Sequence, residues 1–208
     1  AWAEGAAKDI DIMIGCTEDE FTYFHFYFDD LPGFWHGQFP IHFDDQIDID
    51  YWEQAYRKAW PERDFAENYT NFMNSTGFFV GTDLMAEEQS AFKPVYNYLF
   101  RYKSRVEGMG SCHAIEVPFV FKNLDTASGL MFTGDNPPAH LADEMNDAWF
   151  SFAKTGKPFV EGKAPWDPYT AENHIHMVID DNEWKPVHSL HAKEDSVFRP
   201  MYEVLLND

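Results

Sequence analysis

Two short apolar runs predict buried β-strands that lie far apart in the chain. Residues 10–15, Ile-Asp-Ile-Met-Ile-Gly, are largely apolar and end in glycine. Residues 93–102 are rich in the β-branched and aromatic side chains that suit a pleated surface. Runs that are apolar on both faces are typical of parallel strands covered by helices on each side. The pattern therefore predicts an α/β fold with a mostly parallel sheet.

Between these strands the period of the pattern becomes helical, from about residue 44 to residue 92. Three stripes of side chains at helical spacing predict three helices. The stripes are Ile49, Trp52, Tyr56 and Trp60; Phe65, Tyr69, Phe72 and Met73; and Phe78, Thr82, Met85, Gln89 and Phe92. The second helix is expected to begin at Pro61, because proline suits the first helical position. Three helices exceed a simple crossover, so part of this insertion is expected to project as a cap.

Other segments have patterns of their own. Residues 21–28 are aromatic all round, so we expect them to be buried or to line a cavity. Residues 31–40 contain prolines and glycines, which predict a turn-rich connection. A long amphipathic helix is expected to follow Asn136-Pro137-Pro138 and to end at Gly156.

The end of the chain predicts a hairpin and a last helix. Residues 176–180 and 184–187 have the pattern of two strands joined by a short turn. Pro186 argues for an edge position, because proline cannot donate to a neighbouring strand. The helix expected over about 193–206 should be kinked or delayed by Pro200. With no internal repeat or linker, all 208 residues are expected to belong to one domain.

The composition of the chain limits the kinds of molecule that it can be expected to bind. The chain has 15 Lys and Arg against 36 Asp and Glu, a net charge of −21. Such a charge argues against binding to nucleic acid or to an anionic membrane surface. Cys16 and Cys112 are too few for a disulfide framework, which favours a reducing, cytoplasmic location. We find no signal peptide and no apolar stretch of the roughly 20 residues that span a membrane. The chain opens in mid-pattern without methionine, so we expect a fragment or a processed product.

One histidine follows the second predicted strand in a loop of small residues. His113 belongs to residues 108–121, which read Gly-Met-Gly-Ser-Cys-His-Ala-Ile-Glu-Val-Pro-Phe-Val-Phe. Loops beyond the carboxyl ends of strands are where open α/β sheets bind ligands. A catalytic histidine in a hydrolase needs a carboxylate that holds its tautomer. The loop after the first predicted strand offers Glu18, Asp19 and Glu20, and spacing alone does not choose among them.

Two segments carry a family resemblance. Residues 14–24 match the pattern strand-Gly-x-Thr/Asn-x-Asp-Glu-Gly-x-Tyr/Phe-Phe, and residues 110–121 match Gly-x-x-His-x-x-Glu-hydrophobic-Pro-Phe-Val-Phe. Three further matches follow in family order: Thr82-Asp83, Pro94-Val95-Tyr96-x-Tyr98 and residues 147–158. The chain thereby resembles the type-B carboxylesterases, the family of cholinesterases and bacterial para-nitrobenzyl esterases. It departs from the pattern at Phe21, where the family usually carries glycine, and at Ala114, where glycine is common.

The resemblance implies the C-terminal half of an α/β-hydrolase, a doubly wound sheet with helices on both faces and a helical insertion at about 44–92. It implies a serine carboxylic-ester hydrolase, with Glu20 as the triad acid and His113 as the triad base. Tyr23 and Phe24 match positions that line the substrate gorge; the alternative is that both are core aromatics. Neither a cofactor nor a metal is implied.

The nucleophile is missing from these residues. No Gly-x-Ser-x-Gly occurs, and Ser111 lacks the strand-turn-helix context that exposes a nucleophile. The glycine-rich oxyanion segment is missing too. We therefore expect residues 1–208 to form the C-terminal portion of one catalytic domain. It would be inactive without an N-terminal half, which is its expected partner together with a small-molecule ester.

Two other kinds of function stay open at this stage. One is a non-catalytic, cholinesterase-like interaction protein; retention of Glu20 and His113 argues against it. The other is a self-sufficient binding domain.

Four further residues have a plainer interpretation that we prefer. Cys112 is more simply a small core residue than a nucleophile, and Glu116 is expected in a buried polar network. His174 and His176 share a strand face but lack a third metal ligand at a telling spacing. No EF-hand pattern surrounds the acidic loop.

Overall fold

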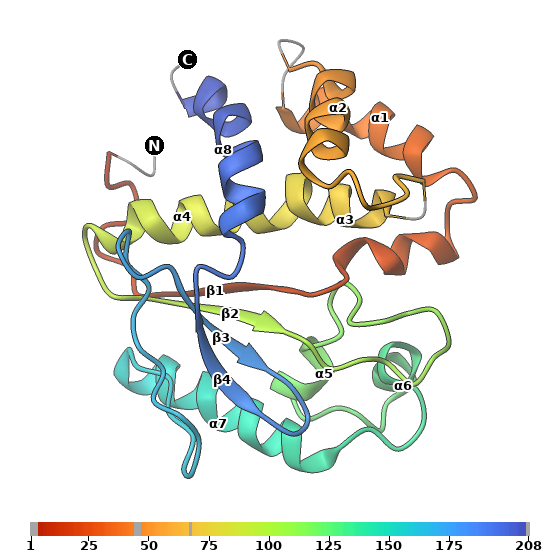
Figure 1. Ribbon diagram of the computed structural model, residues 1–208. Helices are drawn as coiled ribbons and strands as arrows, with labels where there is room; N and C mark the ends of the chain where they lie inside the picture. Colours follow the sequence, from red (N-terminus) through yellow and green to blue (C-terminus); the bar gives the residue numbers. More distant parts are fainter. Residues whose placement is uncertain (1–3, 44–46, 67, 207–208) are drawn as a thin grey trace.

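A four-stranded sheet lies at the centre of the computed structural model, which describes residues 4–43, 47–66 and 68–206. Its strands follow one another in the order β1 (Ile12–Thr17), β2 (Val95–Phe100), β3 (Ile175–Ile179) and β4 (Trp184–His188). β1, β2 and β3 are parallel, and β4 returns antiparallel at the edge (Figure 1). The mostly parallel sheet and the edge position of Pro186 are confirmed; β1 begins two residues later than the pattern predicts.

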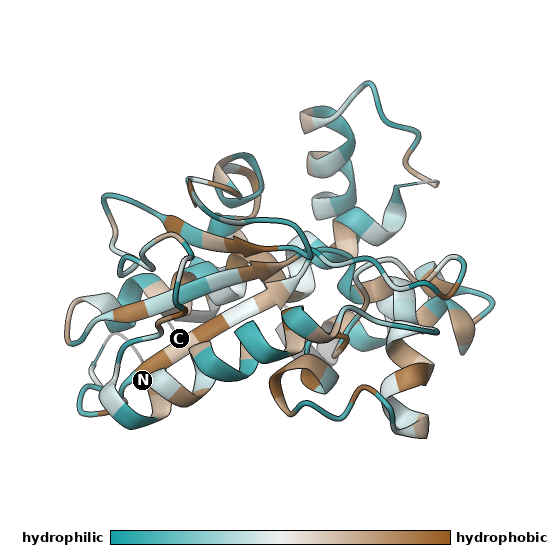
Figure 2. Cartoon of the chain, turned by 90° about the horizontal axis from the view of Figure 1, so that it is seen from below, coloured by the Kyte–Doolittle hydropathy of each residue, from teal (hydrophilic) through white to brown (hydrophobic). Residues whose placement is uncertain are grey.

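Helices cover both faces of the sheet, as the α/β prediction requires (Figure 1). One face carries α4 (Val80–Ser90) and α8 (Ala192–Leu206), and the other carries α5 (Val117–Val120), α6 (Ala127–Thr133) and α7 (Ala139–Thr155). Brown, hydrophobic stretches run along the strands in Figure 2, where these layers meet. On the α7 face, Leu141 and Met145 pack with Phe100 and Met177 of the strands. In the parts of the chain that the structure describes, no helix has both the length and the apolar character needed to cross a membrane.

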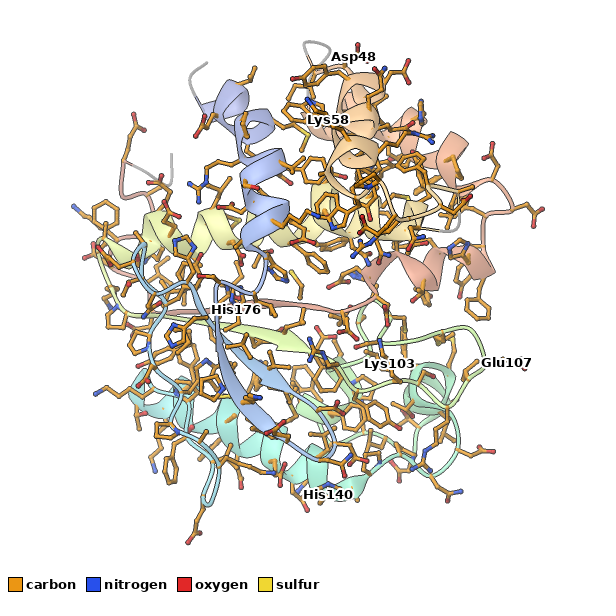
Figure 3. All side chains as sticks on the ribbon, in the orientation of Figure 1. Asp48, Lys58, Lys103, Glu107, His140 and His176 are labelled. Carbon is orange, nitrogen blue, oxygen red and sulfur yellow. The ribbon has the colours of Figure 1, made fainter. Side chains whose placement is uncertain are left out.

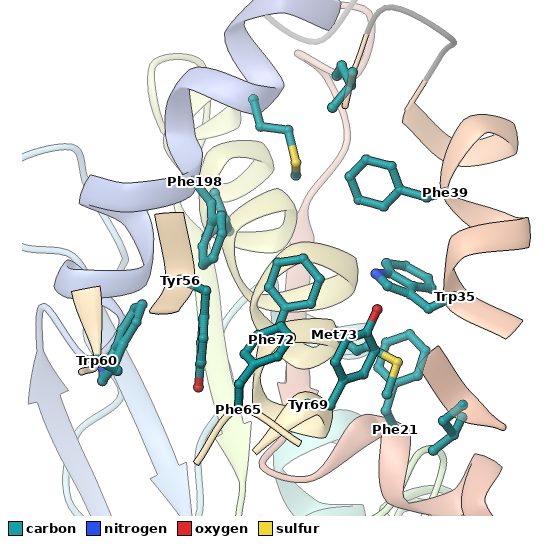
Figure 4. Packing of buried hydrophobic residues seen from close by; sticks show 14 of the residues in the cluster. Phe21, Trp35, Phe39, Tyr56, Trp60, Phe65, Tyr69, Phe72, Met73 and Phe198 are labelled. Atoms are coloured by element: carbon teal, nitrogen blue, oxygen red, sulfur yellow. The ribbon is translucent and has the colours of Figure 1, made fainter. Parts of the chain in front are cut away.

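The helical insertion adds to the layer of helices on the α4 and α8 side of the sheet (Figure 1). Its elements are α2 (Ile49–Ala59), α3 (Tyr69–Asn74) and a π-helical turn, η2 (Ser75–Phe79), that continues directly into α4. An aromatic cluster fills this layer (Figure 4) and includes Phe21, Trp35, Tyr56, Phe72 and Phe198. The helical character of the insertion is confirmed, although its predicted start at residues 44–46 lies outside the described residues.

The turn-rich connection predicted for residues 31–40 is wrong, because this segment forms the helix α1 (Leu31–Phe43). Pro32 lies in the first turn, where a helix needs no backbone N–H. Leu31, Trp35 and Phe39 recur every four residues and are all buried. The apolar stripe therefore outweighs the glycines and prolines.

One predicted helix boundary is also wrong. The helix expected at Pro61 begins at Tyr69, since residues 61–66 form turns in which Phe65 packs back on Tyr56 with ring centroids 5.7 Å apart. The terminal helix is not delayed by Pro200, which lies inside α8. Phe198 on this helix is fully buried in the aromatic cluster. Its burial offsets the backbone hydrogen bond that the proline removes.

Gly15 permits the close approach of β1 to β2. It pairs with Tyr98 in the parallel register. A Cβ atom at Gly15 would lie 2.4 Å from the carbonyl oxygen of Tyr98 and equally close to Cγ of its ring. Because one of these atoms belongs to the backbone, a side chain here would force the two strands apart.

We expect Gly15→Ala to lower the free energy of unfolding by about 1–3 kcal/mol through overpacking. The matched control is Gly37→Ala in α1, where an added Cβ would meet no atom within 4 Å. There alanine should be neutral or should stabilise the helix by up to about 1 kcal/mol. Urea unfolding of the purified protein measures both changes, and equal stability of the two variants would contradict the strand packing described here.

Candidate active site

Loops that follow the carboxyl ends of β1 and β2 bring Glu20 and His113 together. Glu20 begins the 3-10 helix η1 (Glu20–Phe26), and His113 lies in the loop after β2. Glu20 Oε2 lies 2.6 Å from His113 Nδ1, although the residues are 93 positions apart. The backbone N–H of His113 also donates to the carbonyl oxygen of Glu20 at 3.2 Å. A side-chain contact and a backbone hydrogen bond thus both hold Glu20 and His113 together.

The surroundings of this pair leave one nitrogen of the imidazole available. Glu20 is 4% exposed, and its other oxygen, Oε1, accepts the backbone N–H of Thr17 at 2.7 Å. The side chain of His113 is 44% exposed, and no described residue bonds its Nε2. A buried carboxylate on Nδ1 and a free Nε2 are the arrangement that a general base needs.

The structure distinguishes Glu20 from its two acidic neighbours. Arg101 Nε lies 2.7 Å from Glu18 Oε1, and Lys103, labelled in Figure 3, pairs with both Glu18 and Asp19. These cations occupy the two neighbouring carboxylates. Of the three acids that the sequence left open, Glu20 is the one that reaches His113.

Asp19 holds the histidine loop against the acidic loop. Its Oδ2 accepts the backbone N–H of Ser111 at 2.8 Å, and its own N–H donates to the Ser111 carbonyl at 2.9 Å. Gly110, with φ of 60°, leaves room for this contact, since a Cβ there would lie 2.6 Å from Asp19 Oδ2. The fully buried hydroxyl of Ser111 donates to the carbonyl of Phe100 at 2.8 Å. Ser111 is therefore not exposed as a nucleophile.

Asn74 is a positioning residue that the sequence analysis missed. Its side chain is 1% exposed and accepts the N–H of Phe21 through Oδ1 at 2.9 Å. Its Nδ2 donates to the carbonyl of Glu18 at 3.3 Å. Asn74 thus fixes the backbone on both sides of Glu20. It lies at the junction of α3 and the π-helical turn, and no local pattern distinguishes a single asparagine there.

Charge and burial shift the acid-base properties of the site. The hydrogen bond that His113 donates to Glu20 raises the pKa of His113 above its ordinary value, although burial alone would lower it. Burial raises the pKa of Glu116 to about 7, and the charge of nearby Glu20 adds to this rise. Glu116 Oε2 is buried without a hydrogen-bond partner among the described residues. His113 and Glu116 therefore both have raised pKa values beside the buried carboxylate of Glu20.

An apolar cavity of about 520 Å³ adjoins His113. Phe24 and Phe78 line it, and their rings lie 6.0 and 5.5 Å from the imidazole. Phe21 also lines it, and Gly77 makes room for this ring, because a Cβ there would lie 2.8 Å from Phe21. Tyr23 is not among the lining residues; it stacks on a phenylalanine of α6 at 5.4 Å. Of the two proposed substrate contacts, Phe24 faces this cavity and Tyr23 packs beside it.

Comparisons with known proteins agree with this geometry. The model of the carboxylesterase family matches residues 1–198. This chain belongs to the carboxylesterase family. It is 30% identical over 190 residues to the para-nitrobenzyl esterase of Bacillus subtilis and 26% identical over 197 residues to the phenmedipham hydrolase of Pseudarthrobacter oxydans. These alignments cover 86% and 84% of this chain but 36% of either relative, so the chain spans about a third of their length.

Solved structures give the same family relationship. A thermophilic para-nitrobenzyl esterase superposes with a TM-score of 0.73 at 25% identity, over 94% of this chain and 39% of that one. A Geobacillus stearothermophilus carboxylesterase superposes with a TM-score of 0.72 at 27% identity, over 94% of this chain and 42% of that one. The partial α/β-hydrolase fold predicted from the sequence is confirmed.

Among the residues that the structure describes, two groups of side chains have the composition of metal sites. Asp83, His176 and His191 meet in the interior, whereas His36, Asp50 and Glu53 meet nearer the surface. His174, weighed from the sequence as a metal partner of His176, does not belong to the interior group. The His174 ring instead contacts the Ala171 carbonyl and the Tyr169 hydroxyl at 2.7 and 3.1 Å.

The reactivity of the two cysteines is a measure of how tightly the residues around the site are packed. Both are free and buried, and burial raises the pKa of the Cys112 thiol to about 12. We expect neither thiol to react with an aromatic disulfide reagent in the native protein, since the thiolate is the reactive form. On unfolding, both thiols should react, and the absorbance of the released reagent should then count two thiols per chain. Fast reaction of Cys112 in the native state would contradict this packing and favour the alternative that Cys112 is a nucleophile.

Proposed function

We propose that this carboxylesterase chain supplies the general base and its orienting acid to a serine ester hydrolase. His113 is the base and Glu20 the acid. The observation that carries the proposal is the 2.6 Å contact between Glu20 Oε2 and His113 Nδ1, with Nε2 left free. The apolar cavity beside the imidazole supports an uncharged, apolar ester as the substrate.

In the proposed reaction, a serine hydroxyl attacks the ester carbonyl while His113 Nε2 takes the hydroxyl proton. His113 then returns this proton to the leaving alcohol, and an acyl-enzyme remains. A water molecule, deprotonated by the same nitrogen, hydrolyses the acyl-enzyme and regenerates the serine. Throughout, Glu20 holds the ring by Nδ1 and stabilises the imidazolium that forms. No cofactor enters this scheme.

The serine and the oxyanion donors come from the expected N-terminal half. The absence of Gly-x-Ser-x-Gly from these residues supports this division. So does the sheet, because β1 is the last strand in its order and its outer edge pairs with no other described strand. An unpaired parallel edge strand is a place where further strands of the same sheet can add. We place the assembled enzyme in the cytoplasm, on the ground that both cysteines are free.

The non-catalytic interaction protein is the weaker candidate. A protein that only binds a partner has no need of a buried carboxylate aimed at one nitrogen of a half-exposed histidine. Here the two are joined by a side-chain and a backbone hydrogen bond. This double connection favours catalysis.

Substitution of the proposed pair tests the roles directly. In the assembled enzyme, His113→Ala and Glu20→Gln should each lower kcat for an apolar ester by roughly 10³-fold to 10⁶-fold. His140→Ala and Glu107→Gln, at exposed positions, are the matched controls and should retain full activity. Steady-state kinetics decide the matter, and normal kcat in either site variant would end the assignment.

The acid limb of the pH profile tests the electrostatics. Only neutral His113 can act as a base, so activity must fall as the pH drops through its pKa. Because Glu20 raises that pKa, the limb of kcat/KM should lie above about pH 6.5, the ordinary imidazole value. Residual activity of Glu20→Gln should show the limb displaced to lower pH. An undisplaced limb would contradict control of His113 by Glu20.

The cavity predicts where acyl specificity resides. Phe24→Ala should enlarge it and raise the kcat/KM ratio of a branched acyl ester to an acetyl ester by about 10-fold. Tyr23→Phe and Phe150→Ala, the latter 64% exposed on α7, should leave the ratio unchanged. An unchanged ratio in Phe24→Ala would remove this residue from the substrate site.

A further inference from the structure

Asp83, His176 and His191 meet within the fold, on a face of the sheet rather than at its carboxyl edge. Asp83 lies on α4, His176 on β3 and His191 directly before α8. They are 4%, 1% and 8% exposed, and His176 is labelled over the sheet in Figure 3. Asp83 Oδ1 lies 2.7 Å from His176 Nε2, and Asp83 Oδ2 lies 3.0 Å from His191 Nδ1.

Both ring nitrogens of His176 have polar neighbours. His176 Nδ1 lies 3.2 Å from the carbonyl oxygen of His174. Asn97 Nδ2, which only donates, lies 3.1 Å from Nε2 and 2.9 Å from Asp83 Oδ1. His176 Nε2 and Asp83 Oδ1 thus lie 2.7 Å apart in the interior, and both atoms are of the kinds that bind metal ions.

Asn97 is the second observation that points to a ligand. It pairs with His176 across β2 and β3, is 1% exposed, and its Oδ1 is buried with no hydrogen-bond partner. Turning the amide over would give this orphaned oxygen the present place of Nδ2. It would then face the same space as the oxygen of Asp83 and the nitrogen of His176. With the amide turned, four side chains of the cluster would present atoms that can bind a metal ion.

We propose that Asp83, His176, His191 and Asn97 form a structural site for a divalent transition-metal ion, with zinc as the best match. Two imidazoles and a carboxylate suit Zn²⁺, whereas Ca²⁺ and Mg²⁺ prefer oxygen ligands alone. The donor atoms of the three charged side chains already lie within 4.8 Å of one another. With Asn97 Oδ1 as the fourth ligand, the coordination shell closes and leaves no position for a substrate.

The outer contacts of the cluster suit this role. A metal-bound histidine usually donates its second ring N–H to a carbonyl or carboxylate, and His176 Nδ1 has this partner in His174. His191 stacks on Phe79 with ring centroids 4.4 Å apart, which fixes the orientation of its ring. The ion would join α4, β2, β3 and the start of α8 and does not depend on the proposed esterase activity.

The test uses the purified protein with any polypeptide that accompanies it. After treatment with a chelator, it is titrated with Zn²⁺ or Co²⁺ alone, and bound metal is counted by elemental analysis. We expect one ion per chain, the intense visible absorption of four-coordinate Co²⁺, and a higher midpoint of thermal unfolding with Zn²⁺. His176→Gln should lower the affinity by more than the roughly 10-fold to 100-fold that loss of an outer partner costs.

Two control variants separate this site from its neighbours. His174→Gln removes an adjacent imidazole, and Glu53→Gln disables the more exposed group of His36, Asp50 and Glu53. Both should retain one ion per chain. Loss of binding in Glu53→Gln with normal binding in His176→Gln would overturn the proposal.

Measurements on the unaltered protein keep the test valid if a variant fails to fold. X-ray absorption of the zinc-loaded protein should show two imidazoles and two oxygen ligands. Absence of Zn²⁺ uptake by the unaltered protein would overturn the proposal and leave an ordinary hydrogen bond between His176 and Asp83 as the explanation. A zinc shell of oxygen ligands alone would also overturn it.

Discussion

The hydrogen bond between Glu20 and His113 depends on the parallel pairing of β1 with β2. Parallel neighbours end at the same edge of a sheet, so the loops that follow them leave side by side. Glu20 is then fixed from three directions: Thr17 holds its free oxygen, the backbone of His113 holds its carbonyl, and Asn74 holds the peptide groups on either side. Loss of the close strand approach at Gly15 would therefore disturb the site as well as the sheet.

The acidic loop places three carboxylates next to one another, and nearby cations offset their repulsion. Three consecutive carboxylates in a chain of net charge −21 repel one another. Arg101 and Lys103, at the end of β2, neutralise Glu18 and Asp19. The remaining carboxylate, Glu20, is left to the imidazole. Arg101 and Lys103 thus pair with Glu18 and Asp19, and Glu20 alone of the three carboxylates contacts His113.

Sequence reasoning succeeded where the signal is local or periodic. The strands, the hairpin with Pro186 at its edge and the helix that ends at Gly156 follow from patterns of a few residues. The helix at 31–43 was missed because its glycines and prolines conceal a stripe whose burial depends on tertiary packing. Family resemblance selected Glu20 beforehand, and the structure gives the physical reason.

Contacts between residues far apart in the chain could not be predicted from the sequence. Asn74 acts through two peptide groups more than 50 positions away, and Asp83 meets histidines 93 and 108 positions further along. Neither has a spacing that a local pattern can detect. From the sequence, His176 was compared only with His174 on the same predicted strand, so its partners across the fold were not considered.

In the proposed enzyme, His113 activates a serine that lies outside these residues. Labelling of the assembled enzyme with a fluorophosphonate, followed by peptide mass spectrometry, tests this role. We expect one labelled serine, in a Gly-x-Ser-x-Gly sequence outside the 208 residues, whose labelling is abolished by His113→Ala. Label on Ser111, or undiminished labelling without His113, would contradict it.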